Sequence, residues 1–160
     1  MAEKLLRIYL QDHLAGATGG VELARRSAKS NRGTTFGDAL SKLADEIETD
    51  RHALETIMDD LGFGADRAKN VAFWAAEKAG RLKLNGRLTG YSPLSRLVEL
   101  EGLLSGISGK RSLWTALRTI ADDEPRLDPG ALDRLIQRAK EQVSSVEGLR
   151  DRAAREALPR

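Results

Sequence analysis

Apolar residues recur at steps of three and four over four long stretches of the chain, the spacing that places them on one face of an α-helix. We expect long helices over about 3–29, 36–61, 93–122 and 129–157, and a shorter helix over 66–82. Ser92-Pro93 and Asp128-Pro129 each join a capping side chain to a proline suited to the first helical position. Gly62 stands where a helix-ending glycine belongs. The pattern predicts an all-α protein.

The apolar stripes also predict which helices pair. A short connection makes successive helices antiparallel, and the stripe of 3–29 then matches that of 36–61 along its whole length. The stripes of 93–122 and 129–157 match in the same way. The connection over 63–92 is long enough to run back along a bundle. We therefore expect a single domain over 1–160, a four-helix bundle of two antiparallel hairpins joined by a long helical crossover.

Composition narrows the class of protein. Leu and Ala supply most of the apolar residues, whereas Val and Ile, which favour strands, are few. The chain has no cysteine and two histidines, which excludes disulfides, thiol catalysis and Cys-based or His-rich metal sites. Charges interrupt the first residues, and no stretch approaches the roughly 18 apolar residues of a membrane helix. We expect a soluble cytoplasmic protein that makes no membrane contact.

The order of hairpin, crossover and hairpin resembles the ferritin-like four-helix bundle superfamily over nearly the full chain, and Glu101 is similar to the inward glutamate of a third ferritin helix. The resemblance implies a di-iron or di-manganese site built from four glutamates and two Glu-x-x-His histidines. This chain departs from that pattern, because Thr49 stands where His52 needs a glutamate and helix 129–157 has no histidine. His13 replaces the first glutamate. We expect a metal-free relative without a cofactor, with His52 on the surface.

Several polar residues fall on the inner stripes. His13 and Asp50 lie opposite each other, Glu101 lies opposite Arg150, and Arg111 comes to about the level of Asp50. They form a candidate polar core cluster of His13, Asp50, Glu101, Arg111, Gln142 and Arg150. One interpretation is a tuned acid–base pair or a small-molecule pocket. The other is a polar contact that fixes how the helices align.

The glycines of helix 93–122, two aromatic residues of helix 66–82 and the basic segment 67–96 each have alternative interpretations. Gly102, Gly106 and Gly109 share one helix face, which indicates a dimer contact, a binding groove, close packing of the crossover or a break in the helix around 105–109. Phe73 and Trp74 lie off the apolar stripe of 66–82 and would plug this face or mark an oligomer surface. Residues 67–96 carry seven basic and one acidic side chain, which would hold phosphate or nucleic acid, or neutralise the acidic segment 34–66.

No nucleotide-binding, metalloprotease or hydrolase motif occurs in the chain. The sequence therefore favours a non-catalytic structural or interaction protein, expected as a homodimer or with another protein partner. One alternative is an enzyme or small-ligand binder that uses a polar core around His13, Asp50, Glu101 and Arg111. A second is phosphate or nucleic-acid binding through the crossover 67–96, with nucleic acid the less expected partner.

Overall fold

The computed structural model describes residues 1–64 and 90–158, which form four long α-helices and contain no strand. These helices are α1 (Ala2–Ser30), α2 (Gly37–Asp60), α4 (Pro93–Ile120) and α5 (Pro129–Ala157). The all-α class is confirmed, and the arrangement is consistent with a four-helix bundle. Within the described ranges, no helix is both long and apolar enough to cross a bilayer. The expected helix over 66–82, with Phe73 and Trp74, and most of the basic segment 67–96 lie outside the described residues.

Local chemistry sets the helix ends. The Ser92 hydroxyl accepts a hydrogen bond from the Ser95 backbone N–H at 3.2 Å, and the Ser95 hydroxyl returns one to the Ser92 backbone, which makes a capping box before α4. The Asp128 carboxylate accepts from the Ala131 N–H at 3.1 Å and caps α5. After α2, Gly62 has a φ of 78°, which L side chains rarely adopt. All three predicted boundaries hold because each depends on neighbouring residues only.

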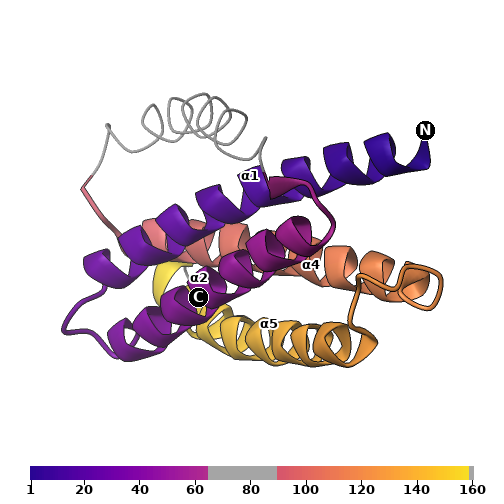
Figure 1. Ribbon diagram of the computed structural model, residues 1–160. Coiled ribbons are helices and arrows are strands. Elements are labelled where there is room, and N and C mark those ends of the chain that lie inside the picture. Colours follow the sequence, from indigo (N-terminus) through magenta and orange to yellow (C-terminus); the bar gives the residue numbers. More distant parts are fainter. Residues whose placement is uncertain (65–89, 159–160) are drawn as a thin grey trace.

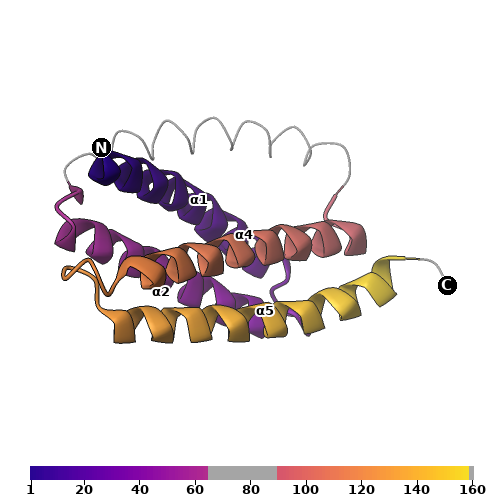
Figure 2. The same ribbon diagram turned by 90° about the vertical axis from the view of Figure 1, so that its right-hand side faces the viewer.

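Neighbouring helices in the chain pack most closely. α1 packs mainly on α2 and α4 mainly on α5, while a smaller contact joins α1 to α4. The start of α4 lies beside the end of α5, where Arg96 and Glu156 pair at 2.7 Å. The end of α4 lies beside the start of α5, where Arg118 and Asp133 pair at 3.2 Å. Figures 1 and 2 show α1 and α5 on opposite sides of the molecule, with α1 inclined to α4 rather than parallel with it.

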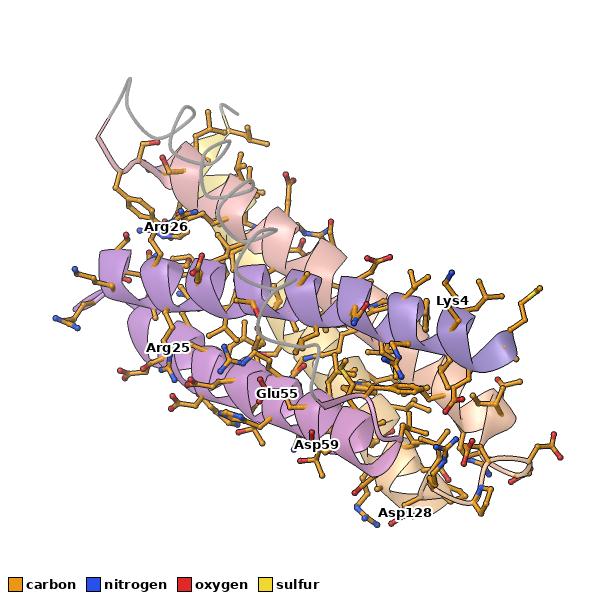
Figure 3. All side chains as sticks on the ribbon, turned by 45° about the horizontal axis from the view of Figure 1, so that its top comes forward. Lys4, Arg25, Arg26, Glu55, Asp59 and Asp128 are labelled. Atoms are coloured by element: carbon orange, nitrogen blue, oxygen red, sulfur yellow. The ribbon has the colours of Figure 1, made fainter. Side chains whose placement is uncertain are left out.

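Surface ion pairs hold α1 between its two neighbours. Figure 3 shows Arg25 and Arg26 on opposite sides of α1. Arg25 pairs with Asp45 and Glu48 of α2, whereas Arg26 pairs with Glu99 of α4 at 3.5 Å. Exposed pairs of this kind are each worth up to about 1 kcal/mol. They therefore orient α1 and leave most of its stabilisation to apolar burial.

A buried polar contact ties the end of α1 to the start of α4. Asn31 is fully buried, and its Nδ2 donates to the Ser27 carbonyl at 2.8 Å and to the Tyr91 hydroxyl at 2.6 Å. Its Oδ1 accepts from Arg96 Nε at 2.6 Å. Because both ends of one amide are used, this contact fixes the chain where α1 turns toward α2. We call Asn31, Tyr91 and Arg96 the Asn31 contact.

Apolar side chains from all four helices fill the interior. The largest of those that are almost completely buried include Trp114, Phe36, Phe63, Leu10, Leu40 and Leu100. Phe36 also lies under two guanidinium groups, with Arg96 at 4.3 Å and Arg152 at 4.5 Å from the ring centroid. Such cation–π contacts are worth about 0.5–1 kcal/mol each at exposed sites and more when desolvated.

Candidate functional site

Described residues of α1, α2 and α4 line a partly open cavity of about 310 Å³. Its walls are mainly apolar, and its side chains include Leu23, Ile47, Leu54, Leu103, Ile107 and Leu113. We call this space the interhelical cavity. The contact between α1 and α4 is smaller than the contacts within each neighbouring pair, and α1 is inclined to α4 (Figure 2).

Glycines from two helices form part of the cavity wall. A Cβ atom built on four of them would meet no atom of residues 1–64 or 90–158 within 4 Å, and one built on Gly102 would approach Leu23 Cδ2 at 3.2 Å. The wall glycines are Gly16 and Gly20 of α1 and Gly102, Gly106 and Gly109 of α4. The three glycines that the sequence placed on one face therefore share one cavity wall. The space exists in part because these side chains are missing.

A buried carboxylate stands at the edge of the cavity. Asp50 of α2 is 2% exposed, and its Oδ2 lies 2.5 Å from Lys110 Nζ of α4. Its Oδ1 accepts from Arg138 Nε of α5 at 2.7 Å, and Gln142 Nε2 donates to Oδ2 at 3.1 Å. We call these four residues the Asp50 cluster. It joins three helices through one side chain.

Further hydrogen bonds join the members of the Asp50 cluster to one another and to Glu46. Lys110 Nζ also donates to Gln142 Oε1 at 2.6 Å, and Gln142 Nε2 reaches Glu46 at 3.3 Å. Burial lowers the pKa of the Lys110 ammonium below its ordinary value, and the charge of Asp50 offsets part of that effect. A buried charge needs a partner and hydrogen bonds, and Asp50 has both. This arrangement suits a fixed structural contact better than a group that exchanges protons.

His13 lines the interhelical cavity but does not pair with Asp50. The hydrogen bonds that Asp50 accepts come from Lys110, Arg138 and Gln142. The ring of His13 meets that of Tyr9 edge-on, with 4.6 Å between centroids. Partial burial lowers the His13 pKa, and the nearby charge of Asp12 counteracts this in part. The expected His13–Asp50 pair is wrong, because longer cationic side chains from α4 and α5 reach the carboxylate instead.

Three other members of the expected polar core cluster lie elsewhere. Glu101 and Arg111 are exposed, and Arg150 pairs with its neighbour Asp151 at 2.8 Å. The expected Glu101–Arg150 pair and the inward Arg111 are therefore wrong. One residue turns an α-helix by about 100°, so a register error of one position moves a side chain from the core to the surface. Gln142 is buried where the stripe placed it.

Sequence reasoning missed Lys110 and Arg138. Lys110 is adjacent to Arg111, the residue that was expected at this level. Arg138 lies four residues before Gln142, so the two share a face of α5. A search for cations one turn from each buried polar position would have found Arg138.

Two hydrogen-bond donors on the cavity wall have no partner among the described residues. They are Nε1 of Trp114, on α4, and Nε of Arg51, on α2. Trp114 is 1% exposed, so bulk water does not reach its indole. No sequence pattern marks either group, because an unused donor becomes visible only when its surroundings are known.

The described residues contain no group of three or more His, Asp or Glu side chains placed to hold a metal ion. His52 lies on the surface, as predicted, and its Nδ1 is 2.9 Å from Glu55 Oε2. No protein-family model matches the chain, and neither does any curated protein or solved structure.

Proposed function

We propose that this protein binds a small, largely apolar molecule in the interhelical cavity without transforming it. The observation that carries the proposal is the wall of helical glycines. Glycine inside a helix costs about 1 kcal/mol relative to alanine. At Gly16, Gly20, Gly106 and Gly109 an alanine Cβ would meet no atom of the described residues within 4 Å, so close packing against α1, α2, α4 or α5 does not explain these glycines. Keeping a cavity open does explain them.

The size of the cavity supports a ligand of modest size. A cavity of about 150 Å³ holds benzene. A cavity of about 310 Å³ therefore holds roughly twice as many atoms, about twelve non-hydrogen atoms. Natural ligand sites begin at about 300 Å³ and combine apolar walls with a few polar groups. The interhelical cavity has both properties.

We also propose that the four helices have the ferritin-like arrangement. It is supported by the chain order of two closely packed helix pairs, α1 with α2 and α4 with α5, separated by a long connection. In this proposal the two pairs are antiparallel hairpins. The Asp50 cluster then lies inside the bundle, where Lys110 and Arg138 supply the positive charge for Asp50.

Filling the cavity tests the proposal. Naphthalene has a suitable size and no polar group, and it stabilises the folded state if it binds there. We expect it to raise the melting temperature of the unchanged protein. We expect no rise in Gly106→Leu, whose new side chain occupies the cavity. The matched control is Gly148→Leu, because Gly148 is an exposed glycine of α5 that lies outside the cavity wall.

Equal responses of the three proteins, or no response in any, would contradict the ligand-binding proposal. A structural or interaction role, as a homodimer or with another protein, would then be the better account. Its support is the exposed apolar side chains of Leu5 and Ile8, 63% and 45% exposed, which lie one turn apart on α1.

A further inference from the structure

The two unpartnered donors come from different helices and line the same cavity. Trp114 Nε1 belongs to α4, and Arg51 Nε belongs to α2. Buried tryptophan N–H groups usually find a hydrogen-bond partner, and buried polar atoms without one are few in native proteins. Two such atoms on the wall of one cavity therefore call for a common explanation.

The acceptors of the Asp50 cluster, at the edge of this cavity, already have donors. Oδ1 of Asp50 accepts from Arg138, and Oδ2 accepts from both Lys110 and Gln142. Gln142 Oε1 accepts from Lys110. The polar part of the cavity wall thus offers unused donors, while each acceptor atom of the Asp50 cluster already has a donor.

We infer that the ligand carries a hydrogen-bond acceptor that binds Trp114 Nε1 and Arg51 Nε, and this inference rests on the proposed function. The acceptor is a ring nitrogen or a carbonyl oxygen. The rest of the ligand is flat and apolar. Glycines on both α1 and α4 leave backbone surfaces that a planar ring system approaches closely, and aliphatic side chains cover the remaining wall. A ligand with donors alone finds no free acceptor in the Asp50 cluster.

Naphthalene and quinoline test this inference, because they share one shape and differ by a single ring nitrogen that accepts a hydrogen bond. Their affinities are compared for the unchanged protein and for Trp114→Phe at pH 7.5. We expect Trp114→Phe to weaken quinoline about three- to tenfold, the range expected for one hydrogen bond, and to leave naphthalene within about twofold. The comparison cancels the difference in water solubility between the two probes.

A second variant and a spectroscopic measurement cover the case in which Trp114→Phe folds poorly. Arg51→Met removes the other donor and should also weaken quinoline more than naphthalene. In the unchanged chain, quinoline should move the indole N–H resonance of Trp114 downfield, and naphthalene should not. Trp74→Phe leaves Trp114 as the single tryptophan and assigns the signal, because the chain contains two tryptophans.

The outcomes separate the two proposals. If neither naphthalene nor quinoline binds, the proposed function fails. If both bind but neither donor variant discriminates between them and the indole resonance does not move, the acceptor inference alone is overturned. A selective loss of quinoline in the donor variants, with the downfield shift, supports it.

Discussion

At the scale of single residues, Asp50 is a buried carboxylate whose charge depends on two cationic partners. It is 2% exposed and holds Lys110, whose side chain is 13% exposed, together with Arg138 at 35%. Removing one partner of a buried ion pair is far more destabilising than replacing both, because the remaining charge stays in the interior. The contribution of Asp50 is therefore best measured by comparing single and double changes.

We predict that Asp50→Ala lowers the free energy of unfolding by about 3 kcal/mol, because it leaves Lys110 buried without a counter-charge. The double change Asp50→Leu with Lys110→Met should recover most of this loss. Asp45→Ala, which removes an exposed partner of Arg25, should change stability by less than about 1 kcal/mol. Urea denaturation measures all three. A double variant that is no more stable than Asp50→Ala would contradict the explanation.

The burial of single polar residues was predictable from the sequence, whereas their binding partners were not. The apolar stripes correctly indicated that Asp50 and Gln142 are buried, because burial follows from helical periodicity. They did not indicate that Lys110 and Arg138 bind Asp50. Long cationic side chains reach inward from the edges of a stripe, and periodicity alone does not say which of them does so.

At the scale of elements, the connection from α1 to α2 depends on close approach of backbone to backbone. A Cβ atom on Gly37, the first residue of α2, would lie 2.6 Å from the carbonyl oxygen of Asn31. That oxygen accepts from the Thr34 backbone N–H at 3.0 Å, and the Asn31 side chain makes the Asn31 contact to Tyr91 and Arg96. Neither group moves without disturbing the junction with α4.

We predict that Gly37→Ala destabilises the protein by about 1–3 kcal/mol, the range typical of overpacking, even though alanine is the better helix former. Gly148→Ala in α5 is the matched control, since nothing lies within 4 Å of its Cβ position. It should stabilise the protein by up to about 1 kcal/mol. Thermal denaturation compares the two variants. Stabilisation of similar size in both would show that the junction is not tightly packed.

Helix positions were predictable because their signals are local. Each predicted boundary of the four described helices lies within two residues of its observed position. Capping serine and aspartate, proline at the first turn and a terminal glycine act over a few residues and need no tertiary information. The incline of α1 on α4 is different, since it depends on how two distant helix faces fit together.

At the scale of the whole molecule, the partial burial of His13 links stability to pH. Burial lowers the pKa of His13 in the folded chain below its ordinary value of 6.5. Between the folded and unfolded pKa values, the unfolded chain binds more protons, so stability rises with pH through this window. Acidification below 6.5 therefore favours unfolding, because it forces a proton onto a half-buried ring.

We predict that the unchanged protein loses more thermal stability between pH 7.5 and pH 5 than His13→Gln does. Both proteins share the titration of their carboxylates, so the difference between them isolates the ring. His52→Gln is the control, because His52 is exposed. Its melting temperatures over the same pH range are compared with those of His13→Gln. Melting temperatures across this pH range measure the effect, and parallel curves for His13→Gln and the unchanged protein would rule it out.

Part of the cavity wall was predictable from the sequence. The sequence placed Gly102, Gly106 and Gly109 on one helix face and gave a binding groove as one interpretation. It could not add Gly16 and Gly20 or the unpartnered donors of Trp114 and Arg51, because these meet the first three only in the folded chain. Helix positions follow from local patterns, whereas a cavity is a property of the space between helices.

The way in which the Asp50 cluster spans the chain has a kinetic consequence. α1 with α2 and α4 with α5 make contacts between neighbouring segments, which form fast, whereas Asp50 and Arg138 are 88 residues apart. We therefore expect the two helix pairs to form early and to dock late, so that Asp50 acquires its partners after the rate-limiting step. Its roughly 3 kcal/mol would then act almost entirely on the rate of unfolding, slowing it by about 100-fold and prolonging the lifetime of the folded chain.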